Sequence, residues 1–289
     1  MSAGPGGAWL DGRVVPAGAA AVPATDLGLR QGLGVFETLR IERGRTAGLA
    51  WHLERLVAGG GRLGIDVDPV RARAGLAALL ATADDADLVA RITVTAGDAG
   101  DGWPAVAAGA ARTLVTLHPA PPLPAAPADA VVLSGPRAPA GLADVKATSY
   151  VGSVVAQRVA RSLGADVALL EEDGAILEAA DGNVIAVRGD VLTTPPCDGR
   201  IIPGVTRRLV LDLARGLGLD VREAALTRTD LAAADLVVVT SSVRRLRPLR
   251  RVDGVTVPGG GSHPLLAELL AGLAGIAAAA EPIAGTTDR

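Results

Sequence analysis

Residues 119–127 have the sequence PAPPLPAAP, in which five of nine residues are proline. Proline fixes its own φ angle and has no backbone N–H, so such a run does not lie inside a helix or a strand. We therefore interpret residues 119–128 as a linker between two domains, formed by residues 1–118 and residues 129–289. The 289 residues, 49% of them hydrophobic, suffice for two packed cores.

Strand-like and helical patterns occur on both sides of this linker. Before it, Asp-Gly at 11–12 predicts a hairpin, residues 35–41 and 89–95 alternate as strands do, and residues 51–63 and 69–83 have helical spacing. The pattern shows neither regular βα alternation nor a fixed-period repeat, so it predicts an α+β fold in both halves. We also expect strands at 114–117, 130–133, 167–170, 176–178, 184–187, 191–194 and 236–240, and helices at 152–163, 204–217 and near Asp230.

Composition excludes several classes of protein. A formal net charge of −3 and a pI near 5.7 give no basic field that would attract nucleic acid or an anionic membrane surface. Cys197 is the only cysteine, so an internal disulfide is impossible, and the N-terminus lacks the features of a secretory signal. The apolar stretch 265–280 contains Glu268 and is too short to span a bilayer, so we expect a packed helix. We predict a cytoplasmic protein.

Several common functional motifs are missing. Residues 32–34 (GLG) lack the third glycine of a dinucleotide-binding turn, and the sequence contains no P-loop and no Gly-x-Ser-x-Gly turn. The histidines His52, His118 and His263 share no metal-ligand spacing with Cys197, so we predict no metal site.

Lys146 is the only lysine among the 28 basic residues. Arginine stays protonated, whereas a lysine amine can lose its proton and attack a carbonyl group. The count alone also fits a lysine that survives by chance in an arginine-rich chain. Its surroundings favour function, because residues 144–150 (DVKATSY) join a loop to a predicted helix, and residues 177–184 (LEAADGNV) follow about thirty residues later.

Six segments together resemble one enzyme family. They are residues 34–40 (GVFETLR), 52–56 (HLERL), 146–150 (KATSY), 178–183 (EAADGN), 203–207 (PGVTR) and 240–242 (TSS). In this order they resemble the class IV, fold type IV, pyridoxal-phosphate enzymes, which include branched-chain and D-amino-acid aminotransferases and aminodeoxychorismate lyase. The resemblance covers nearly the whole chain. It implies a small N-terminal α/β domain, a larger β-barrel-like C-terminal domain, pyridoxal 5′-phosphate as cofactor and a homodimer.

The resemblance also implies roles for individual residues. Lys146 would hold the cofactor covalently and then move the substrate proton, and Glu178 would face the pyridine nitrogen, supported by Asn183. Tyr150 would lie near the cofactor's phenolic oxygen. The alternatives are a solvated carboxylate for Glu178 and an ordinary buried aromatic residue for Tyr150.

A phosphate group requires fixed hydrogen-bond donors and a positive charge. A helix N-terminus supplies backbone N–H groups, an arginine supplies a bidentate countercharge, and a turn supplies hydroxyl groups. The resemblance assigns these parts to Gly204, Val205 and Thr206, to Arg55, and to Ser241 and Ser242. An ordinary helix cap and a solvated helix arginine are the alternatives.

The turn at residues 240–249 (TSSVRRLRPL) is more similar to the lyase than to the aminotransferases. Residues 97–102 (GDAGDG) also lack the Arg-x-His of D-amino-acid aminotransferases. We therefore predict a 4-amino-4-deoxychorismate lyase that releases pyruvate and 4-aminobenzoate. The alternatives are a class IV aminotransferase that uses a branched-chain or D-amino acid with a 2-keto acid, and a non-catalytic protein of the same fold. The candidate substrate-binding residues are Arg30, Phe36, Arg91 and Arg244.

Overall fold

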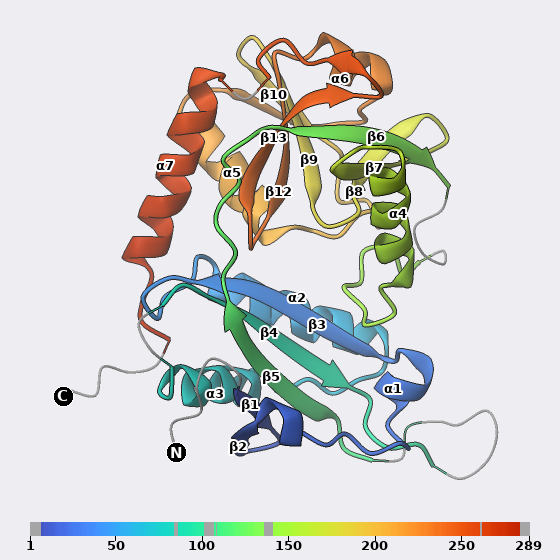
Figure 1. Ribbon diagram of the computed structural model, residues 1–289, viewed down its shortest axis with the longest axis vertical. Helices are drawn as coiled ribbons and strands as arrows, with labels where there is room; N and C mark the ends of the chain where they lie inside the picture. Colours follow the sequence, from blue (N-terminus) through green and yellow to red (C-terminus); the bar gives the residue numbers. More distant parts are fainter. Residues whose placement is uncertain are drawn as a thin grey trace. The chain divides into compact units, whose positions relative to one another are not determined.

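The computed structural model describes residues 7–83, 86–100, 107, 109–135, 141–260 and 262–283 (Figure 1). These residues divide into two compact units. Unit 1 comprises the described residues within Met1–Pro121, Val145–Ser149 and Ile276–Arg289, and unit 2 those within Pro122–Asp144 and Tyr150–Gly275. The domain boundaries stay a prediction, and the units differ from them because the Lys146 segment and the C-terminal segment belong to unit 1.

Unit 1 contains a five-stranded antiparallel sheet with the order β2-β1-β5-β4-β3. The predicted hairpin is confirmed, since Asp11 (φ 47°) and Gly12 (φ 101°) form its two-residue turn. The other predicted strands of this half are also confirmed. The strands are β1 (Gly7–Leu10), β2 (Arg13–Pro16), β3 (Gly34–Ile41), β4 (Leu88–Thr95) and β5 (Arg112–Pro119).

The helices of unit 1 are α1 (Leu27–Gln31), α2 (Leu49–Arg62) and α3 (Pro69–Leu80), with a 3₁₀ turn at Ala17–Ala19. Helix α3 begins where the sequence predicts, because Pro69 occupies the first turn and the Asp68 carboxylate accepts hydrogen bonds from two backbone N–H groups. Helix α2 packs on β3, and α3 packs on β1 and β5. The two predicted helices therefore cover the sheet.

Unit 2 contains a nine-stranded sheet with the order β11-β10-β9-β12-β13-β6-β7-β8, with β14 paired to β13. Helix α4 connects the parallel strands β6 and β7. The sheet curls, because β8, the last strand in this order, contacts β9 through the tight turn that joins them. This curl agrees with the barrel-like domain that we expect. The strands are β6 (Ala128–Ser134), β7 (Val167–Glu172), β8 (Ala175–Ala179), β9 (Asn183–Arg188), β10 (Val191–Thr194), β11 (Asp220–Glu223), β12 (Leu236–Ser241), β13 (Arg245–Val252) and β14 (Val255–Thr256).

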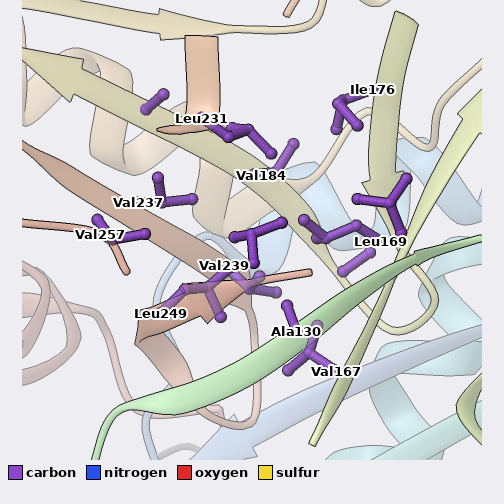
Figure 2. Close-up of a cluster of buried hydrophobic side chains, with 14 of the residues drawn as sticks. Ala130, Val167, Leu169, Ile176, Val184, Leu231, Val237, Val239, Leu249 and Val257 are labelled. Carbon is purple, nitrogen blue, oxygen red and sulfur yellow. The ribbon is translucent and has the colours of Figure 1, made fainter. Parts of the chain in front are cut away.

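Aliphatic side chains from most of these strands form the core of unit 2 (Figure 2). Leu169, Ile176, Val184 and Val237 are fully buried in it, and Val239 is nearly so. Helix α5 also packs against β12, so this strand is covered on both faces. The helices of this part of the chain are α4 (Val151–Ser162), α5 (Val205–Gly216), α6 (Arg228–Ala233) and α7 (Pro264–Ala279). Among the described helices, none combines the length and the apolar character that crossing a membrane requires.

Strand β13 corrects the prediction that residues 240–249 form a turn, since the turn spans only residues 242–244 and the strand begins at Arg245. Arg245 and Arg247 alternate with the buried Leu246 and Pro248, and Pro248 pairs with Val238 of β12. The parallel pairing with β6 begins only at Leu249. Pro248 therefore lies where no backbone donor toward β6 is needed, which explains how a proline occupies a central strand.

Candidate active site

The Lys146 segment pairs with the edge strand of the unit 1 sheet. The backbone N–H of Phe36 donates to the carbonyl of Lys146 (3.0 Å), and the N–H of Thr148 donates to the carbonyl of Gly34 (2.8 Å). The Thr148 hydroxyl donates to the carbonyl of Gly32 (2.7 Å). Because β3 is an edge strand, its open hydrogen-bonding side receives this segment, and this pairing fixes the backbone of Lys146.

Two glycines allow this close approach. A Cβ atom on Gly34 would lie 2.8 Å from the Val94 carbonyl oxygen and 3.0 Å from the Thr148 hydroxyl oxygen. Gly32 adopts a left-handed conformation (φ 66°) at the end of α1. The GLG sequence that fails as a nucleotide-binding turn therefore provides space for the Lys146 segment.

Three of the predicted site residues meet on β3 and β4. Lys146 Nζ lies 4.4 Å from the centroid of the Phe36 ring, and Arg91 Cζ lies 3.7 Å from the same centroid. Phe36 is buried, whereas Lys146 and Arg91 are partly exposed. Two cations thus share one aromatic ring, which attracts them through its quadrupole. Arg30 is exposed on α1, and the contacts of the described residues do not place it with this group.

A buried ionic cluster lies next to this group on β3. Arg55 donates from Nε to Glu37 Oε1 (2.7 Å) and from Nη2 to Glu37 Oε2 (2.8 Å), and His52 Nδ1 lies 2.6 Å from Oε2. Burial raises the pKa of Glu37, but the charges and hydrogen bonds of Arg55 and His52 outweigh it and lower the pKa to about 2. Burial lowers the pKa of His52. At neutral pH, a neutral His52 therefore donates from Nδ1 to an ionised Glu37.

Neither Glu37 nor His52 is predicted as a site residue from the sequence, although both lie in the segments that resemble the family. The signal that could have found Glu37 is a single carboxylate directly after the apolar residues Val35 and Phe36 of β3, because a buried carboxylate needs a partner. The identity of that partner depends on how α2 packs on β3.

In unit 2, Glu178 and Asn183 belong to one buried network. Glu178 Oε2 accepts hydrogen bonds from the backbone N–H of Ile202 (3.1 Å) and from Asn183 Nδ2 (3.3 Å). Asn183 Nδ2 also donates to the Ile202 carbonyl (2.8 Å). Glu178 is 2% exposed, so the alternative of a solvated carboxylate does not apply. The network fixes the carboxylate against the chain that enters α5.

Helix α5 begins directly beside this network. A Cβ atom on Gly204 would lie 1.9 Å from Asn183 Oδ1, so only glycine fits at this N-cap without displacing Asn183. Gly204 has no side chain with which to cap the helix, and Val205 and Thr206 are buried in its first turn. The first turn of α5 therefore presents backbone N–H groups that a side chain at the N-cap does not satisfy.

The turn that follows β12 lies against the same network. Thr240 pairs with Asn183 across the two strands, and its hydroxyl is buried without a hydrogen-bond partner among the described residues. The Ser241 hydroxyl accepts from the backbone N–H of Arg244 (3.2 Å), and Ser242 begins the turn. Thr240, a weaker candidate than Ser241 and Ser242 from the sequence, is therefore the residue that pairs directly with Asn183.

Two further predicted residues border this network. The Tyr150 hydroxyl donates to the carbonyl of Ala180 (3.1 Å), in the turn between β8 and β9. Arg244 Nη1 donates to Asp181 Oδ2 (2.5 Å) in the same turn, and both of these side chains are about 40% exposed. Tyr150 and Arg244 therefore each attach a site segment to the Glu178–Asn183 turn.

The model of the amino-transferase class IV family matches residues 34–252. The chain belongs to the class IV aminotransferase family. It is 32% identical over 253 residues to a putative branched-chain-amino-acid aminotransferase of Methanocaldococcus jannaschii, which covers 85% of this chain and 88% of the relative. It is 28% identical over 254 residues to the aminodeoxychorismate lyase of Bacillus subtilis, with 86% and 87% covered. The crystal structure of the Escherichia coli branched-chain amino acid aminotransferase superposes with a TM-score of 0.84, at 27% identity and 94% coverage of both chains.

Class IV aminotransferases depend on pyridoxal 5′-phosphate, and the residues described above fit this cofactor. Lys146 offers an amine, and Glu178 offers a buried carboxylate that suits a protonated ring nitrogen. The buried Thr240 hydroxyl and the first turn of α5 offer donors of the kind that a phosphate requires. Among the described residues, no group of three or more His, Cys, Asp or Glu side chains could hold a metal ion.

Proposed function

We propose that this class IV enzyme is a lyase that converts 4-amino-4-deoxychorismate into pyruvate and 4-aminobenzoate. The observation that carries the proposal is the turn after β12, where Arg244 and Arg245 follow Ser242. Arg245 has a left-handed backbone (φ 57°), at a hairpin position that glycine usually occupies. An arginine there costs about 1 kcal/mol, and such strain is typical of functional sites.

A pair of arginines suits the proposed substrate because it carries two carboxylates. Arg245 and Arg244, which also pairs with Asp181, lie beside Ser241 and Ser242, and Arg91 adds a positive charge beside Lys146. Guanidinium groups bind carboxylates in a bidentate manner. The whole-length similarity to the Bacillus subtilis aminodeoxychorismate lyase supports the same substrate.

The site residues then have the following roles. When bound, pyridoxal phosphate supplies a carbonyl for the substrate amine and a ring that accepts electrons. Lys146 Nζ would hold the cofactor and, as a free amine, would take the proton from the ring carbon of the substrate that bears the amino group. Glu178, held by Asn183, keeps a proton at the pyridine nitrogen.

The bonds balance without a second substrate. Loss of the ring proton and cleavage of the neighbouring bond between the ring carbon and the ether oxygen leave an aromatic ring. The enol of pyruvate departs and takes up a proton to become pyruvate. Gly204, Val205, Thr206, Arg55, Ser241 and Ser242 are proposed to bind the phosphate, and Tyr150 to lie near the phenolic oxygen.

The second candidate is an aminotransferase that uses a branched-chain or D-amino acid and a 2-keto acid. It is favoured by the buried Phe36 ring next to Lys146, which would suit an aliphatic side chain. The similarity to the putative branched-chain-amino-acid aminotransferase also supports it. In either case we expect a homodimer in the cytoplasm, and sedimentation of the purified protein tests the dimer.

One experiment separates the two reactions. The purified enzyme is given 4-amino-4-deoxychorismate without any keto acid, and separately leucine or D-alanine with 2-oxoglutarate or pyruvate. We expect equimolar 4-aminobenzoate and pyruvate in the first reaction, with Lys146→Arg inactive. Product formation only when a keto acid is present would refute the lyase and establish the aminotransferase.

A further inference from the structure

Glu37 and His52 take no part in the proposed reaction, yet both are buried beside its residues. Glu37 is 0% exposed and His52 is 1% exposed. An ionised carboxylate inside a protein is costly unless it is paired, and apolar residues of similar size often give equal stability. Stability alone therefore does not explain why the chain holds a charge at this position.

The contacts of Glu37 restrict the guanidinium of Arg55. Both oxygens of Glu37 accept from Arg55, at 2.7 and 2.8 Å, and this fork fixes the plane of the guanidinium. His52 Nδ1, at 2.6 Å, fixes the carboxylate in turn. His52 and Arg55 are three residues apart on α2, so they reach the same face of the helix and meet Glu37 on β3.

We propose that Glu37 is a positioning residue for the cofactor phosphate, which acts by fixing the orientation of Arg55, and that His52 holds Glu37 for this task. The inference rests on the proposed function, because it takes Arg55 as a phosphate ligand. The Glu37 contacts use the edge of the guanidinium group formed by Nε and Nη2. These contacts hold the guanidinium group in one orientation. Donors that are oriented before an anion arrives bind it without the entropic cost of ordering them.

The test compares pyridoxal 5′-phosphate with pyridoxal, which lacks the phosphate. The full chain, freed of cofactor, is titrated with each compound, and the absorbance of the bond to Lys146 gives two dissociation constants. For Glu37→Gln we expect the constant for pyridoxal phosphate to rise about tenfold or more, while the constant for pyridoxal stays within about twofold. Glu42→Gln is the matched control, because it removes a carboxylate from another arginine pair at the end of the same strand.

Two further variants test whether Glu37 acts through Arg55. In an Arg55→Ala background, Glu37→Gln should change neither constant further, because the group that it orients is gone. His52→Phe removes the support and keeps the Glu37–Arg55 pair, so it should weaken pyridoxal phosphate binding by a smaller factor. This variant also carries the test if Glu37→Gln does not fold.

Each outcome has one meaning. The positioning role is overturned if the unaltered chain binds pyridoxal phosphate more tightly than pyridoxal and Glu37→Gln keeps the same ratio of the two dissociation constants. Where Glu37→Gln does not fold, the same result with His52→Phe overturns it. Equal loss of both compounds in the variant would also overturn it, since that result indicates general damage to the site. If the unaltered chain forms no bond between Lys146 and pyridoxal phosphate, the proposed function itself fails.

Discussion

Acid should destabilise unit 1 through Glu37. The Arg55 and His52 contacts hold the pKa of this buried carboxyl at about 2, against an ordinary value of 4.5. At about 1.4 kcal/mol per pH unit, this difference corresponds to about 3 kcal/mol of folding free energy at neutral pH. Because the unfolded chain takes up the proton first, the contribution is complete well above pH 4.5 and is lost as the pH falls toward 2. By pH 3, about 2 kcal/mol should be gone.

Urea unfolding between pH 3 and pH 5, followed by tryptophan fluorescence, measures this effect. Trp9 and Trp51 lie in unit 1, so the signal reports on this unit. The lowered pKa of His52 adds a contribution of the same sign, which is lost as the pH falls below 6.5 toward the folded-state pKa of this histidine. Glu37→Gln should be less stable at pH 5 but should lose about 2 kcal/mol less than the unaltered chain on acidification. The control, Glu42→Gln, should lose as much stability on acidification as the unaltered chain. An equal loss in Glu37→Gln and the unaltered chain would refute the reasoning.

Four other substitutions have defined outcomes. Lys146→Arg should keep the fold and the charge but lose the cofactor absorbance, and borohydride should no longer fix the cofactor to the chain. Arg245→Gly should stabilise the protein by about 1 kcal/mol, as urea unfolding measures it, because glycine tolerates the positive φ, while kcat/KM falls about tenfold. Gly204→Ala should weaken cofactor binding and cost about 1 to 3 kcal/mol in thermal unfolding, since its Cβ would displace Asn183. Leu169→Ala should cost about 2 to 5 kcal/mol and leave kcat unchanged, and a loss below 1 kcal/mol would contradict its place in the core.

The elements of this fold follow largely from local patterns. The hairpin at Asp11 and Gly12, the alternating strand β3 and the helix that begins at Pro69 each have a local cause, namely a turn type, a period of two, or a cap. Strand β13 does not, because its arginines and Pro248 are typical of an exposed turn. It becomes a strand only because β12 pairs with it on one side and β6 on the other.

The sequence by itself determined that Lys146 is the one side-chain amine available for imine chemistry, and its motifs indicated the family. Only the tertiary structure decided what surrounds that amine. The Lys146 segment pairs with an edge strand more than a hundred residues earlier, and Arg55 reaches a carboxylate on that strand, Glu37. Hydrogen-bond partners this far apart are chosen by the packing of whole elements, and a local pattern of residues carries no information about that packing.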